Sequence, residues 1–131
     1  MTVIRVSPYF FPWPMGVDRT GHLLMQASTV SGGTRALLAH GGGYVALPSL
    51  TGAPEASTTA GDINDRGEAV GSSDTASGGR HAVLWRDGEV IDLHTLGTSS
   101  SATAIGPRGH IAGTYVATSG ETRAFPGGAA G

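Results

Sequence analysis

The sequence predicts an all-β protein built from one structural unit that occurs three times. Glycines recur at Gly21, Gly67 and Gly109, which are 46 and then 42 residues apart. Short apolar runs of strand length lie between turn-forming residues, and turns follow one another every ~8–12 residues. No stretch of the chain sustains the i, i+3, i+4 apolar spacing of a helix. Together these three observations favour an all-β repeat protein.

The repeat extends to many positions besides these glycines. We place its units at approximately 14–56, 57–101 and 102–126, within a single domain that covers residues 1–131. The following residues superpose at the same two offsets: Val17, Ile63 and Ile105; Leu24, Val70 and Ala112; Gly32, Gly78 and Gly120; Ala36, Ala82 and Ala124; Leu37, Val83 and Phe125.

The middle unit predicts four short strands joined by polar turns. The turn Asn64-Asp65-Arg66-Gly67 ends in a glycine that can take a positive φ, and Arg86-Asp87-Gly88 is a second turn. The predicted strands are Thr59–Ile63, Glu68–Ser72, His81–Trp85 and Glu89–Leu93.

The third unit has no sequence for a fourth strand after Arg123-Ala124-Phe125. The amino terminus offers a replacement, because Val3–Val6 has the pattern of Val90–Leu93. Its spacing also fits, since Val6 precedes Val17 by 11 residues and Leu93 precedes Ile105 by 12. We therefore expect the first strand to complete the last unit, which would remove a free sheet edge.

Three segments of the middle unit resemble the HAF repeat. They are Ala60–Gly71 (AGDINDRGEAVG), Gly79–Trp85 (GRHAVLW) and Gly88–Gly97 (GEVIDLHTLG). The third unit keeps Ala102–Ile105 and Arg123–Phe125, and the first keeps Gly21, Arg35–Leu38 and Leu47–Leu50, so the resemblance covers most of residues 14–126. It implies β-propeller blades, which in this family occur in longer, exported arrays. It implies architecture and no particular chemistry.

Three blades do not close a propeller, because known rings have four or more. We expect two chains to form a six-bladed ring as a homodimer, with the strand Val3–Val6 exchanged between them. Two alternatives remain open at this point. The three units could close on themselves as a threefold β-trefoil or β-prism, or the chain could be a fragment of a longer array.

Composition excludes several classes of function. The chain has no Cys and no Lys, which rules out a thiolate metal site, a cysteine nucleophile and a lysine Schiff base. Its formal net charge of −2 argues against nucleic acid as a partner. No apolar run approaches the ~20 residues that span a bilayer. Met1–Val6 is followed by a segment with three prolines and not by an export signal, so we predict a cytoplasmic protein without a membrane partner.

Four ionisable residues are weak catalytic candidates. His22, Glu68 and His110 each follow the repeat glycine directly, and two imidazoles with a carboxylate can bind iron or zinc. A turn exit facing solvent accounts for this column better, so we predict no metal and no cofactor. The fourth candidate is His81, for which a structural role is favoured, while neighbouring Trp85 is expected to pack between units. His40 and His94 are treated as surface or loop residues.

An aromatic segment near the amino terminus is the candidate ligand contact. Tyr9, Phe10, Phe11 and Trp13 lie within a few residues of one another, and interspersed prolines keep the segment extended. Such a strip could clamp a ligand or dock on a partner, because aromatic side chains give large contact areas at low entropic cost. The alternative is that the segment plugs a barrel or forms the core of the dimer.

These observations favour a non-catalytic binding or assembly module for a small molecule, a sugar or a peptide. The alternative is a small-molecule enzyme, a cyclase, isomerase or lyase, with an apolar pocket on the repeat axis. We prefer the binding module because no constellation of residues has a catalytic spacing.

Overall fold

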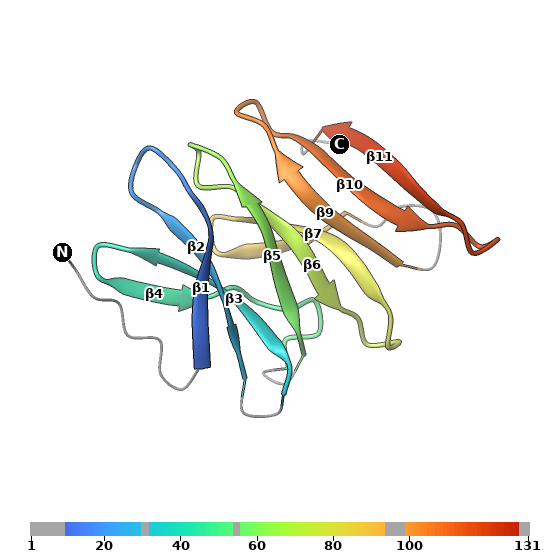
Figure 1. The fold of residues 1–131 in the computed structure, drawn as a ribbon, viewed down its shortest axis with the longest axis horizontal. Coiled ribbons are helices and arrows are strands. Elements are labelled where there is room, and N and C mark those ends of the chain that lie inside the picture. Colours follow the sequence, from blue (N-terminus) through green and yellow to red (C-terminus); the bar gives the residue numbers. More distant parts are fainter. Residues whose placement is uncertain (1–9, 30–31, 54–55, 94–98, 129–131) are drawn as a thin grey trace.

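The computed structural model describes residues 10–29, 32–53, 56–93 and 99–128, and within these ranges the protein is all-β (Figure 1). The described strands form two antiparallel sheets of four strands and one of three, each ordered as a simple meander. The first sheet contains β1 (Phe10–Val17), β2 (Leu23–Ser28), β3 (Thr34–His40) and β4 (Gly43–Ala46). The second contains β5 (Thr58–Ile63), β6 (Ala69–Asp74), β7 (Arg80–Arg86) and β8 (Glu89–Asp92). The third contains β9 (Ser99–Ile105), β10 (His110–Val116) and β11 (Thr122–Gly128).

The second sheet confirms the four strands predicted for the middle unit, each within about two residues of its expected ends. The turn that begins at Asn64 is closed by a hydrogen bond from the Gly67 N–H to the Asn64 carbonyl, at 3.1 Å. No described part of the chain forms a helix long and apolar enough to cross a membrane.

Two columns of repeat glycines are explained by backbone conformation. Gly21, Gly67 and Gly109 end the turn between the first and second strands of each sheet, with φ of 92°, 74° and 89°. Gly32, Gly78 and Gly120 serve the next turn, with φ of 91°, 90° and 91°. Residues with a side chain rarely adopt these positive φ angles, so the repeat requires glycine at both turns.

The three sheets stack in chain order, and the second lies between the other two (Figure 1). Strand β5 packs against β1, β2 and β3, while β9 packs against β5, β6 and β7. We call the side of each sheet that looks toward the next sheet along the chain its forward face, and the opposite side its backward face. The described strands form no closed barrel.

Both junctions between sheets have apolar cores. Leu24 and Ala36 on the forward face of the first sheet meet Ala69, Val83 and Trp85 of the second. The indole of Trp85 is 2% exposed and donates a 2.8 Å hydrogen bond to the carbonyl of Pro48, which confirms its expected place between units. Val70, Ala82 and Leu84 of the second sheet meet the third at its buried residues Ala102, Ile105 and Ile111.

A polar contact also recurs at the two junctions. The N–H of Ala36 donates to the hydroxyl of Thr58 on the next sheet, at 2.8 Å. At the equivalent place one unit later, the N–H of Ala82 donates to the hydroxyl of Ser100, also at 2.8 Å. The corresponding position in the first sheet is Pro12, which has no hydroxyl.

The two outer sheets carry the same faces without a described neighbour. On the third sheet, Ala112, Thr114 and Ala124 lie on the forward face and are exposed, whereas their counterparts Val70, Ser72 and Ala82 are buried. On the backward face of the first sheet, Met25, Ala27, Leu37 and Ala39 form an apolar cluster with Leu23 and Tyr44. Met25, Ala27, Leu37 and Ala39 are nevertheless buried, at 0–6% exposed, although no described strand of another sheet packs over them.

The closing strand predicted at Val3–Val6 lies outside the described residues. Among the strands that the structure does describe, β11 is the edge strand of the third sheet. It corresponds to β3 and β7, which pair with the further strands β4 and β8 in the other two sheets. The place for a fourth strand is therefore next to β11.

Candidate functional site: a polar cluster at the sheet turns

A buried carboxylate organises the turn between β1 and β2. The side chain of Asp18 is fully buried, and its Oδ1 accepts hydrogen bonds from the Thr20 N–H at 3.0 Å and the His22 N–H at 2.9 Å. The Thr20 hydroxyl donates to the same oxygen at 2.8 Å. The other oxygen, Oδ2, lies 3.0 Å from Nδ1 of His22. This turn therefore fixes both the backbone and the imidazole of His22.

The pKa of Asp18 is lowered below its ordinary value of 3.8. Burial of the carboxylate is the largest influence and acts to raise the pKa. The hydrogen bonds from His22 and Thr20, together with the charge that His22 can carry, act in the opposite direction and outweigh it. Asp18 is therefore an anion at neutral pH, and its oxygens can only accept hydrogen bonds from the donors that face them.

A second histidine lies against the first. The rings of His22 and His40 stack with centroids 4.3 Å apart and planes 22° from parallel. Nε2 of His40 lies 3.1 Å from the carbonyl oxygen of Thr20. Because a carbonyl only accepts, we assign the proton of His40 to Nε2, and by the same reasoning that of His22 to Nδ1, facing Asp18. Nε2 of His22 and Nδ1 of His40 then carry lone pairs.

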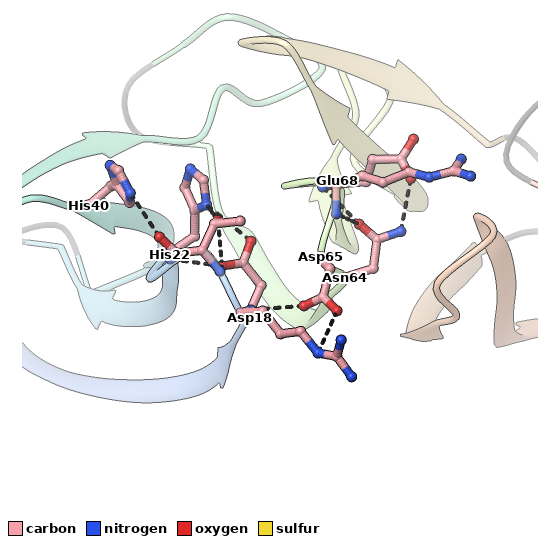
Figure 2. A network of polar contacts seen from close by, with 9 residues as sticks. Asp18, His22, His40, Asn64, Asp65 and Glu68 are labelled. Carbon is pink, nitrogen blue, oxygen red and sulfur yellow. Dashed lines mark hydrogen bonds and ion pairs between the residues drawn. The ribbon is translucent and has the colours of Figure 1, made fainter.

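The same positions of the second sheet carry a different polar set (Figure 2). Oδ1 of Asn64 accepts from the Glu68 N–H at 3.1 Å, and its Nδ2 donates to Oε1 of Glu68 at 2.8 Å. Nη1 of Arg86 pairs with Oε2 of Glu68 at 3.3 Å. Asn64, Glu68 and Arg86 thus replace Asp18, His22 and His40. In the third sheet the same column reads Gly106, His110 and Gly128.

The turns of neighbouring sheets touch one another. Arg19 binds Asp65 with its backbone N–H at 2.8 Å and with Nε at 3.3 Å. Nδ2 of Asn64 also donates to the Gly106 carbonyl at 3.0 Å. These contacts place one polar column along the same end of all three sheets.

An open pocket of about 340 Å³ lies beside the two histidines of the first sheet. Its lining residues are His22, Leu38, His40, Gly43, Tyr44 and Val45. Two imidazoles against an apolar wall suit a small ligand with polar groups on one side.

The predicted site residues are separated by this arrangement. His22 lies in the pocket, Glu68 is buried in its pair with Arg86, and His110 is exposed at the start of β10. Within the described parts of the chain, no three His, Asp or Glu side chains are grouped as metal ligands. His81 lies elsewhere, with Nδ1 3.1 Å from both carboxylate oxygens of Asp92.

The aromatic segment is described only in part. Tyr9 lies outside the described residues, as does His94. Phe10 and Phe11 belong to β1, and Trp13 on the same strand is 40% exposed. None of the residues that line the pocket at His22 comes from β1.

Sequence reasoning missed Asp18 and His40. The expectation of a surface position for His40 is correct in that the residue is exposed, but its stacking on His22 was not foreseen. The repeat carried the missing information, because Asp18 and His40 occupy the columns of Asn64 and Arg86.

No protein-family description, curated protein or solved structure matches this chain.

Proposed function

We propose that the protein is a non-catalytic assembly and binding module, in which two copies complete one ring of six sheets. The observation that carries this proposal is the exposed forward face of the third sheet. Ala112, Thr114 and Ala124 occupy the positions at which Val70, Ser72 and Ala82 pack against the next sheet within the chain. A face of small side chains suits a bulky apolar partner surface.

The partner surface is the backward face of the first sheet in a second copy. Its cluster of Met25, Leu37 and Ala39 occupies the columns of Gly71, Val83 and Trp85, the side that the second sheet turns toward the first. These three side chains are 0–6% exposed in the single chain, so docking of a second copy requires this face to become uncovered first. Each copy would offer one forward and one backward face. Two copies then satisfy both faces by a twofold rotation, which closes the ring and prevents an open filament.

The closing strand fits this assembly better than it fits a single chain. The connection from Val6 to Val17 is one residue shorter than that from Leu93 to Ile105, which links two neighbouring sheets. The first and third sheets of one chain are not neighbours, because the second lies between them. The strand Val3–Val6 is therefore proposed to pair with β11 of the other copy.

Size-exclusion chromatography with light scattering tests the assembly. A mass of about twice the single-chain 13.2 kDa supports it, and a folded monomer at every concentration contradicts it. Ala112→Arg places a charge on the exposed forward face and should give a folded monomer. Ala76→Arg, in the exposed turn before β7, is the matched control and should remain dimeric.

The strand exchange has its own test. Ile4→Pro removes a backbone N–H from the proposed strand and should weaken the dimer, whereas Ser7→Pro, just outside it, should not. Equal dimerisation of both variants would contradict pairing by this strand and leave the packing of the faces untouched.

The enzyme alternative has less support. It requires an enclosed apolar pocket on the repeat axis, whereas the pocket at His22 is open and lies at the ends of β2, β3 and β4. Binding of a small ligand is the function that this pocket supports.

A further inference from the structure

We propose that residues 1–9 of the same chain cover the backward face of the first sheet, and that they leave it when a second copy docks there. The covering does not depend on the proposed ring, whereas the competition with a second copy rests on it. The inference assigns one occupant to a face for which the described strands supply no partner.

The burial of this face requires a cover. Ala27, Leu37 and Ala39 are 0% exposed, yet no described strand of another sheet packs over them. The described apolar side chains that pack against the cluster come from β2 and β4 of the same sheet. The forward face of the third sheet also lacks a described neighbour, and there Ala112 is exposed, as expected for an open face of an antiparallel sheet. Chain outside the described strands therefore covers the cluster.

Residues 1–9 have the position and the length for this role. They directly precede Phe10, which pairs with Ser28, so they join the sheet beside Ala27. A segment of this length can span up to ~30 Å, whereas the six residues of β2 span ~20 Å. The other segments outside the described residues have two to five residues each, namely 30–31, 54–55, 94–98 and 129–131. The last two follow β8 and β11, on sheets that lie beyond the forward face of the first.

The sequence of this segment suits an apolar sheet face. In an extended segment, Ile4 and Val6 would lie on one side, and Arg5 and Ser7 on the other. The first pair offers β-branched side chains to the cluster, while the second pair can remain in water. The strand Val3–Val6 is also the one proposed to pair with β11 of the other copy, and it cannot occupy both places at once. Uncovering of the face and exchange of the strand would therefore be one event.

Methyl NMR with a soluble paramagnetic probe tests the covering. All proteins in this test carry Ala112→Arg, so that the ring does not form. In the full chain the probe should not reach the methyl groups of Leu37, and removal of residues 2–9 should raise their relaxation to the level of Val45, which is 59% exposed. Leu84, which is buried between two sheets, should stay protected in both proteins. Protection of Leu37 that survives the truncation overturns the proposal.

Point substitutions keep the test decisive if the truncated chain does not fold. Ile4→Asp places a charge on the side of the segment that faces the cluster and should expose the methyl groups of Leu37. Ser7→Asp adds the same charge on the opposite side and should leave Leu37 protected. Equal protection of Leu37 in these two variants overturns the covering and leaves the ring untouched.

The competition has a kinetic test in the wild type. Because residues 1–9 must be released before docking, the apparent rate constant for reassociation of diluted monomers should reach a ceiling as protein concentration rises. A rate constant that stays proportional to concentration overturns the competition and leaves the covering and the ring standing. A wild type that is monomeric at every concentration, with Leu37 protected, overturns the ring and the competition and supports the covering.

Discussion

The buried carboxylate of Asp18 holds Nδ1 of His22 at 3.0 Å, and 46 residues later the amide of Asn64 holds the carboxylate of Glu68 at 2.8 Å. The two turns have the same backbone conformation and carry different charges. In the first, an anion orients an imidazole, and in the second, a neutral amide orients an anion. One turn geometry can therefore carry either a basic or an acidic side chain at the same end of the sheet.

Replacing Asp18 should show how much the turn depends on its charge. Asp18→Asn keeps an acceptor for the backbone, as Asn64 does, and should destabilise the protein by about 1 kcal/mol through loss of charge-assisted hydrogen bonds. Asp18→Ala should cost about 2–4 kcal/mol, because it leaves the N–H groups of Thr20 and His22 without an acceptor. Urea unfolding of both variants measures the difference, and equal losses would refute the argument.

Acid should remove the contribution of Asp18. Because the folded-state pKa of Asp18 lies below its ordinary value of 3.8, the ionised group stabilises the fold at higher pH. This contribution is complete above the unfolded-state pKa and is lost as pH falls through the folded-state pKa. The stability difference between wild type and Asp18→Asn should thus be constant from pH 7 to about 5 and shrink below about 3.8. Unfolding free energies measured across this range provide the check, and a difference that grows toward low pH would contradict the sign.

The hydroxyl of Ser100 should contribute more to the free energy of unfolding than the hydroxyl of the adjacent Ser101. Ser100→Ala leaves the buried N–H of Ala82 without its 2.8 Å acceptor and should cost about 1–3 kcal/mol. Ser101→Ala, on the adjacent residue of β9, is the matched control and should change stability by less than about 0.5 kcal/mol. Thermal or urea unfolding measures the stability of both variants. Similar losses for the two would contradict a stabilising hydrogen bond between Ser100 and Ala82.

Replacement by alanine should change stability by very different amounts at two glycines whose φ is not positive. A Cβ on Gly71 would lie 1.9 Å from the carbonyl oxygen of Thr59, so Gly71→Ala should cost more than about 3 kcal/mol or prevent folding. A Cβ on Gly43 would meet nothing within 4 Å, and Gly43→Ala should be close to neutral. Circular dichroism and urea unfolding of the two variants measure this difference. A Gly71→Ala protein as stable as the wild type would contradict the prediction.

The all-β class, the strands of the middle unit and the place of Trp85 could be predicted because their causes are local or repeated. Turn residues such as Asn64 and Gly67 determine the hairpins within a few positions of themselves. The incomplete third unit was visible for the same reason, although the strand expected to complete it lies outside the described residues.

The polar cluster could not be predicted in the same way. His40 reaches His22 only because β2 and β3 pair in a particular register, and the sequence near either residue contains no trace of that pairing. The bond from Arg19 to Asp65 likewise joins the turns of two different sheets. The contact between turns requires the packed sheets, whereas the stacking of His22 and His40 requires only the register of one hairpin.

Pro12 stands in the first sheet where Thr58 and Ser100 accept hydrogen bonds at the two internal junctions. A contact made there by another copy would lack that bond, so packing between the two faces would depend on nonpolar surface. Separation of subunits should accordingly require less free energy than opening either internal seam. Dilution of the proposed ring should therefore separate the two copies before either copy unfolds.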